Sequence, residues 1–172
     1  MAIPKRHASR PGTYFLTSRT WESRPLFAKE TVCDVFVSSL LHYRDQAAYQ
    51  IHSFVLMPDH FHLLLTPGSE VALERAVQYL KGGSARRIGE ELRFLLPVWQ
   101  RGYSDHRIRD AKDFEAHVRY IEQNPVKQRL VLAAPEYPWS SACGRFAMDK
   151  PPLNLASALK PPGNLLGRCR HV

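Results

Sequence analysis

The chain has 172 residues, a length typical of a single domain, and 44% of its residues are hydrophobic and 23% charged. This composition excludes a collagen, a long coiled coil and a wholly disordered chain. Lysine and arginine outnumber aspartate and glutamate by 24 to 16, so the formal net charge is +8. A basic excess of this size favours a polyanionic partner, with nucleic acid first, although charge that serves solubility alone gives the same numbers.

The cysteines and the N-terminus indicate a cellular compartment. Cys33, Cys143 and Cys169 are far apart and form no C-x-x-C pair, which argues against a disulfide framework and a zinc ribbon. No apolar core of a secretory signal follows the basic N-terminus, and the longest apolar runs are far shorter than the ~20 residues of a membrane span. We therefore expect a cytoplasmic protein with no membrane partner.

The first half of the chain predicts a strand, a helix and a hairpin. Residues 13–20 are β-branched and aromatic, as in a strand. Residues 28–46 place apolar side chains at three- and four-residue spacings, as in an amphipathic helix. Two apolar runs, 48–57 and 60–66, flank the turn dipeptide Pro58-Asp59 and predict a hairpin.

The second half predicts further helices and one more strand. A helix over 70–80 should stop near Lys81-Gly82-Gly83, and Ser84 should cap a second helix over 85–95. Residues 98–108 predict a strand and 110–123 a helix, which Asn124-Pro125 should end.

The element order β-α-β-β-α-(α)-β-α predicts an α+β fold. It is the split βαβ pattern of ferredoxin-like proteins, an antiparallel sheet with helices packed on one face. We expect a basic N-terminal arm over 1–12, one folded domain over 13–132 and a proline-rich C-terminal tail over 133–172.

His60 and His62 form the first candidate site. Alternate residues of a strand share a face, so both imidazoles point to one side and Phe61 to the other. Two such rings can converge on one metal ion. The alternative is a pair of ordinary core or surface histidines, but a polar pair in an otherwise apolar hairpin needs an explanation.

Tyr120 and Asn124 form the second candidate site. They are four residues apart and share a helix face if the last turn is intact, with His117 one turn earlier on nearly the same face. A phenol beside a carboxamide suits a nucleophile with a metal ligand. From these residues alone, the stronger interpretation is that Tyr120 is a core residue and Asn124 a helix terminator.

Together these segments resemble a known protein family. The sequences VLMPDHFHLLL (55–65), WQRGYSDHRIRD (99–110) and YIEQNPVKQRLV (120–131) are similar to those of HUH single-tyrosine transposases, and most similar to REP-associated tyrosine transposases. The resemblance covers roughly residues 13–146. It departs at Gln128-Arg129-Leu130, where the family often has a glycine, which bears on the turn after the helix.

The resemblance implies a metal-dependent strand transferase acting on single-stranded DNA beside palindromic REP-type hairpins. Tyr120 would be the nucleophile and form a 5′-phosphotyrosine link. His60, His62 and Asn124 would hold Mg²⁺ or Mn²⁺, with His117 as a reserve ligand. Relatives include dimers that share sites, so a homodimer and a monomer are both compatible with the sequence.

Basic residues would bind the DNA backbone, and exposed aromatic rings would stack on bases. The expected phosphate contacts are Arg19, Arg24, Lys81, Arg86, Arg87, Arg107, Arg109, Arg119 and Lys127. Trp21, Trp99 and Tyr103 are the candidate stacking residues, with core packing the stronger expectation for Trp99.

The sequence is also compatible with two other functions. One is a domesticated protein on the same fold that binds hairpin DNA without cutting it. The other is a metalloenzyme that does not act on nucleic acid, such as a small phosphodiesterase, whose turnover would survive the loss of Tyr120.

Overall fold

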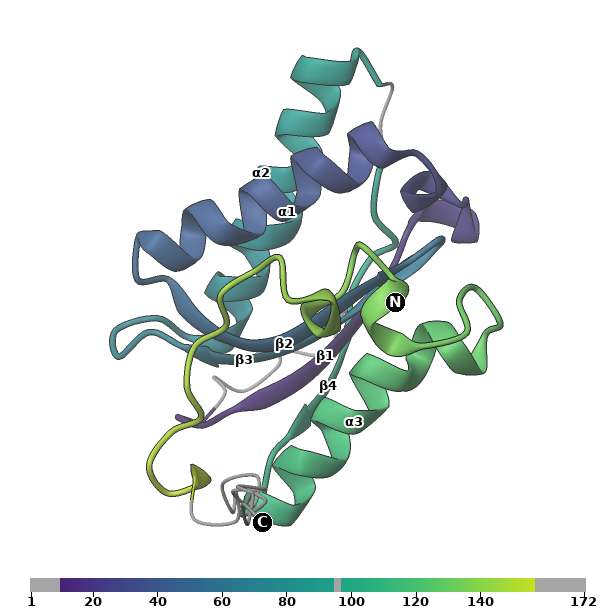
Figure 1. The fold of residues 1–172 in the computed structure, drawn as a ribbon. Helices are drawn as coiled ribbons and strands as arrows, with labels where there is room; N and C mark the ends of the chain where they lie inside the picture. The colour runs from purple at the N-terminus through teal and green to yellow at the C-terminus, as the bar shows by residue number, and fades with distance from the viewer. Residues whose placement is uncertain (1–9, 95–96, 157–172) are drawn as a thin grey trace, which may run out of the picture.

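The computed structural model describes residues 10–94 and 97–156 (Figure 1). Its centre is a four-stranded antiparallel sheet with the strand order β2-β3-β1-β4. The strands are β1 (Tyr14–Arg19), β2 (Tyr49–Met57), β3 (His60–Pro67) and β4 (Ser104–Arg107), and the α-helices are α1 (Glu30–Asp45), α2 (Leu73–Leu92) and α3 (Ala111–Lys127). Short 3-10 turns lie at Trp21–Ser23, Leu26–Ala28, Ala134–Glu136 and Ser141–Cys143. The predicted α+β class and split βαβ order are confirmed.

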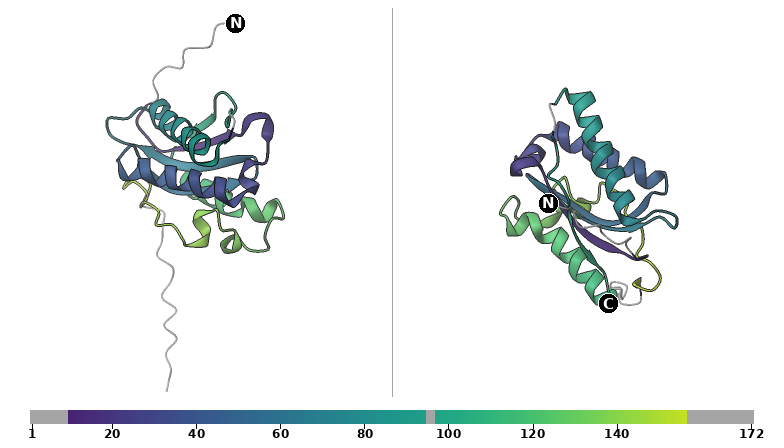
Figure 2. Two further views of the ribbon diagram at one scale, coloured as in Figure 1. Left: turned by 90° about the horizontal axis from the view of Figure 1, so that it is seen from above. Right: turned by 180° about the vertical axis from the view of Figure 1, so that it is seen from behind.

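Helices cover both faces of this sheet, so the expectation that all of them pack on one face is wrong. α1 and α2 lie on one face and α3 on the other (Figures 1 and 2). On β3, the Phe61 ring packs on Phe36 of α1, whereas the His62 ring lies against Tyr120 of α3. The second face carries Phe15 and Leu64 as well as polar groups, and α3 buries this apolar surface with its own stripe.

α2 is one continuous helix, so the predicted break at Gly82-Gly83 is wrong. Two helical glycines cost about 1 kcal/mol each, and packing between α1 and α2 offsets that cost. A Cβ atom at Gly83 would lie 2.4 Å from the Tyr43 ring of α1, so the close contact requires glycine there. Ser84 is buried inside the helix and donates to the Lys81 carbonyl instead of capping a new helix.

β4 is shorter than the predicted strand over 98–108. Trp99 makes only an isolated bridge to Thr20, and its indole lies in the core with Nε1 donating to the Lys81 carbonyl at 3.0 Å. The Lys81 ammonium in turn donates to the carbonyls of Gln100 and Gly102. These contacts hold residues 100–102 against α2, and the strand begins only at Ser104.

α3 continues through Asn124-Pro125 to Lys127, beyond the predicted end at 123. Pro125 lies in the last turn, where a proline removes one helical hydrogen bond. Leu130 donates to the Pro125 carbonyl and Gln128 to that of Asn124, which closes the helix end. The last turn is therefore intact, and Tyr120 and Asn124 share a helix face.

The described part of the expected C-terminal tail packs along the outer edge of β2. The Leu56 amide donates to the Trp139 carbonyl, and Ile51 and Asp149 exchange backbone and carboxylate hydrogen bonds of 2.7 Å. This segment covers the edge strand that would otherwise be open to pairing with another chain. The remainder of the tail, 157–172, and most of the N-terminal arm lie outside the described residues.

The neighbouring glycines of α2 provide a matched test of its packing. Nothing lies within 4 Å of a Cβ at Gly82, so Gly82→Ala should raise the free energy of unfolding by about 0.5–1 kcal/mol through helix propensity. Gly83→Ala should lower it by about 1–3 kcal/mol, because the methyl group meets Tyr43. Urea denaturation measures both changes, and equal effects of the two substitutions would contradict this packing.

Candidate active site

His60 and His62 project from β3 onto the face covered by α3. β3 begins at His60, directly after the Pro58-Asp59 turn, and pairs with β1 so that Thr17 lies opposite His62 and Arg19 opposite His60. The two imidazole rings are 4.8 Å apart between centroids. The expectation that both rings share one face of the strand is confirmed.

Each imidazole is held through its Nδ1 atom. Nδ1 of His60 lies 2.6 Å from an Asp59 carboxylate oxygen, and the other oxygen of that carboxylate accepts from Arg19 at 3.0 Å. Nδ1 of His62 lies 2.8 Å from the Thr17 hydroxyl oxygen. These contacts orient the two rings through their Nδ1 atoms.

His62 is buried and electrically neutral. Only 6% of its surface is exposed. Burial lowers the pKa of His62 to about 3, and the nearby His60 and Arg19 act in the same direction. A neutral imidazole has the lone pair that metal ligation needs.

Tyr120 lies beside His62 although the two are far apart in the sequence. Its ring is 5.2 Å from the His62 ring and 5.7 Å from that of Phe15, centroid to centroid. The side chain is 40% exposed, and the Lys127 ammonium lies 5.2 Å from the centre of the ring. The phenol is therefore both next to the histidine pair and open to a ligand.

Asn124 is buried, with 5% of its surface exposed. The contacts of α3 show where it lies. Phe114 contacts His52, which bonds to Thr66 at the end of β3, and Tyr120 contacts His62 further back along that strand. α3 thus runs antiparallel to β3, and its next turn, with Asn124, extends toward His60.

The predicted DNA-contacting residues fall on two sides of the molecule. Those of α2 lie on the face opposite the histidine pair, and several are paired: Arg86 with Glu90, Arg87 with Glu91, and Lys81 with backbone carbonyls. Arg19 ends β1, Arg107 ends β4, Arg109 lies between β4 and α3, and Arg119 and Lys127 lie on α3, with Lys127 over the Tyr120 ring. Arg24 lies elsewhere, over the Phe94 ring. Arg24 is held by the carbonyls of Trp21 and Pro97.

The structure also gathers two residues that sequence analysis did not single out. His106 of β4 and Asp113 of α3 form a cluster with His117. The His117 ring lies 4.7 Å from the Phe15 ring, centroid to centroid. His117 thus packs beside the site with different partners from His60 and His62. The spacing of Asp113 and His117, one helical turn apart, was a visible signal, but its link to His106 needs the pairing of β4 with β1.

The burial of His62 predicts its pH behaviour. The imidazole should stay neutral from pH 8 to pH 5, because its pKa of about 3 lies well below that range. An unfolded chain protonates this ring near pH 6.5, so the part of the stability that depends on neutral His62 should fall as pH decreases from about 6.5 toward 3. NMR of the ring carbon protons measures the titration, and a midpoint near 6.5 would show that the ring is not buried.

Comparison with known proteins places the chain in a family. The family model described as "Transposase IS200 like" matches residues 13–124. A Haemophilus influenzae protein named "Putative REP-associated tyrosine transposase" is 27% identical over 82% of this chain and 85% of its own length. The Escherichia coli K12 protein named "REP-associated tyrosine transposase" is 25% identical over 82% of each chain.

A solved structure shares the fold. It is titled as a REP-associated tyrosine transposase bound to a REP hairpin, and it superposes with a TM-score of 0.67 at 24% identity, covering 88% of this chain and 92% of that one. No helix in the described ranges 10–94 and 97–156 is long and apolar enough to cross a membrane. With the family model matching residues 13–124, the chain belongs to the IS200-like transposase family and is similar to proteins named as REP-associated tyrosine transposases.

Proposed function

We propose that this chain cuts and rejoins single-stranded DNA beside palindromic, REP-type hairpins in a metal-dependent reaction with a 5′-phosphotyrosine intermediate. The observation that carries the proposal is the contact of the half-exposed Tyr120 ring with His62, 5.2 Å apart between centroids. This chemistry needs a nucleophile that a DNA strand can reach and side chains that can hold a metal ion, and the exposed phenol and the two oriented imidazoles lie side by side.

The residues present fit a divalent cation. Nδ1 of His60 and of His62 is occupied by Asp59 and Thr17, so both Nε2 atoms are free to act as ligands. The buried Asn124 side chain, on the turn that extends toward His60, is the proposed third ligand. Imidazole and amide oxygen ligands suit Mn²⁺ or Mg²⁺, and an ion held by them would supply positive charge to polarise the scissile phosphate.

Tyr120 acts as the nucleophile. Its phenolic oxygen attacks phosphorus, the proton of the hydroxyl leaves to solvent, and the bond from phosphorus to the 3′-oxygen breaks. The departing 3′-oxygen takes up a proton and becomes a free 3′-OH, while the 5′ side of the strand stays on Tyr120. Since the new phosphodiester keeps the energy of the old one, a 3′-OH can reverse the step and reseal DNA without ATP.

The surroundings of Tyr120 suit a polyanionic strand. Lys127 lies over the phenol ring at 5.2 Å, where its charge favours a developing phenolate and binds phosphate oxygens. Arg119 precedes Tyr120 on α3 and is exposed. The Arg19 side chain is 52% exposed and pairs with Asp59, the partner of His60. Together with the net charge of +8, these cations support DNA as the partner.

Replacement of the nucleophile tests the chemistry directly. Labelled hairpin DNA with a single-stranded flank, incubated with Mn²⁺ or Mg²⁺, should give a covalent protein–DNA adduct on a denaturing gel. Tyr120→Phe should remove the adduct, because the attacking oxygen is gone, and should keep hairpin binding in a gel-shift assay. Tyr79→Phe is the matched control, since Tyr79 packs on Tyr43 on the other side of the sheet and should leave the adduct unchanged.

Two results would overturn the proposal. Cleavage that persists in Tyr120→Phe would point to hydrolysis by a phosphodiesterase. Tight hairpin binding with no adduct from the unaltered chain, at any divalent ion tested, would favour the non-cleaving DNA-binding protein.

The hydroxyl that orients His62 provides a test of the metal site. Thr17→Val keeps the side-chain shape but removes the partner of Nδ1, and should weaken Mn²⁺ binding by about 10–100-fold. Thr13→Val is the control, because it removes another β1-side hydroxyl, which bonds to Thr66 and contacts neither His60 nor His62. Isothermal titration with Mn²⁺ measures both affinities, and equal weakening in the two variants would argue against a ligand role for His62.

A further inference from the structure

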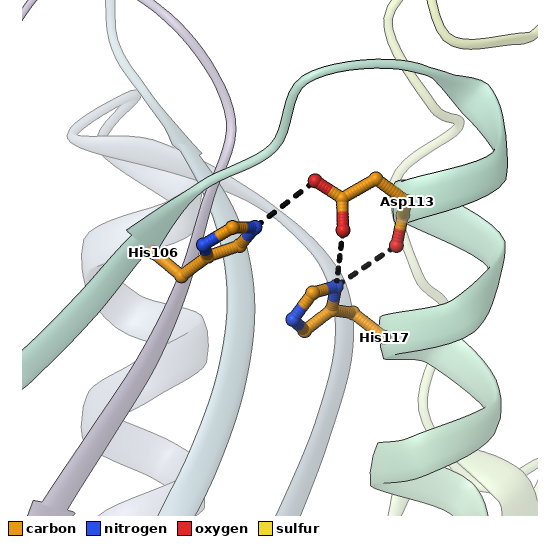
Figure 3. Close-up of side chains that lie close together, drawn as sticks. All are labelled: His106, Asp113 and His117. Carbon is orange, nitrogen blue, oxygen red and sulfur yellow. Dashed lines mark hydrogen bonds and ion pairs between the residues drawn. The ribbon is translucent and has the colours of Figure 1, made fainter.

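A second group of ligand-bearing side chains lies where β4 meets the first turns of α3 (Figure 3). Nε2 of His106 lies 3.0 Å from one oxygen of Asp113, and Nδ1 of His117 lies 3.1 Å from the other. The two imidazole rings stack with 4.9 Å between centroids and 20° between planes. One carboxylate and two imidazoles thus converge from two different elements, and we call them the β4–α3 cluster.

The spacing within the β4–α3 cluster fits a metal ion. The three ligand atoms lie within 4.8 Å of one another. Two ligands at about 2.0–2.2 Å from one ion are themselves roughly 3–3.5 Å apart, which matches the two nitrogen–oxygen separations. The nitrogen atoms of His106 and His117, within 4.8 Å of each other, would need to approach to roughly 3–3.5 Å to share one ion.

The protonation states also permit ligation. One oxygen of the Asp113 carboxylate accepts hydrogen bonds from His106 and from Arg109, as an ionised carboxylate does. Nδ1 of His117 also lies 2.8 Å from the Asp113 carbonyl. When Nδ1 gives up its proton to bind an ion, that carbonyl keeps its helical partner, the amide of residue 117, so no buried polar group is left unpaired.

An ion could enter from solvent. The side chains of His106 and His117 are 43% and 22% exposed, whereas that of Asp113 is 8% exposed and is the most buried member of the β4–α3 cluster. Arg109 is the competing cation, with Nε 3.3 Å from an Asp113 oxygen, but its side chain is 76% exposed and free to swing away. Because the guanidinium end of this pair is exposed to solvent, Arg109 can exchange the carboxylate for water when an ion binds.

We propose that His106, Asp113 and His117 form a second metal site, which binds one divalent transition-metal ion of the Zn²⁺ or Co²⁺ class. Two imidazoles and one carboxylate form a donor set that suits such ions better than Mg²⁺. The Phe15 ring separates this site from the histidine pair, because it contacts His117 on one side and His62 on the other. Bound metal would fasten β4 to α3 one turn before Tyr120.

Metal binding in the absence of the first site tests this proposal. In the full chain with His60→Ala and His62→Ala, equilibrium dialysis should still find one equivalent of Zn²⁺, and Co²⁺ should give visible absorption bands of a nitrogen- and oxygen-ligated ion. Adding His106→Ala should weaken Zn²⁺ binding by more than about 10-fold. Adding Glu115→Gln, which removes one negative charge from the same part of α3 outside the cluster, should leave it unchanged.

Arg109→Ala provides an independent test with the opposite sign. Removal of the competing guanidinium should tighten Zn²⁺ binding, and His106 and Arg109 are exposed enough that neither variant depends on repacking of the core. The proposal is overturned if the chain lacking His60 and His62 binds no Zn²⁺, if His106→Ala and Glu115→Gln bind Zn²⁺ equally well, or if Arg109→Ala leaves the affinity unaltered. DNA cleavage enters none of these measurements, so their outcome is separate from that of the proposed transferase.

Discussion

The packing of α3 across the polar face of the sheet is the contact on which the candidate site depends. A single ring, Phe15 of β1, touches His62, His117 and Tyr120 and so ties the hairpin to the helix. Aromatic contacts of this kind add to the apolar area that the helix buries through Phe114 and Ile121. Without this packing, the phenol and the imidazoles would belong to separate elements with no reason to meet.

The same face holds its imidazoles through fixed hydrogen bonds. Asp59 bonds to His60, Thr17 to His62, and Asp113 to both His106 and His117. A partly buried imidazole without a partner would be costly and free to rotate. Carboxylate and hydroxyl partners remove that cost and set which nitrogen faces outward, so the face is rigid before any ligand arrives.

Much of the fold and part of the site could be predicted, and the errors have physical causes. The hairpin and the shared face of His60 and His62 follow from alternation along a strand, which is a local property. The break expected at Gly82-Gly83 was wrong because Tyr43, on another helix, requires a glycine at Gly83. The helix end expected before Pro125 was wrong because a proline in the last turn removes only one hydrogen bond.

The sequence by itself determined the strand and helix types, the basic charge, the paired histidines and the shared face of Tyr120 and Asn124, because period and spacing act within one element. The tertiary structure alone decided that α3 covers the face opposite α1 and α2, that Tyr120 lies against His62, and that His106 joins Asp113. These are contacts between elements distant in the chain. Their geometry depends on which apolar surfaces must be buried together, and no spacing within a single segment records that choice.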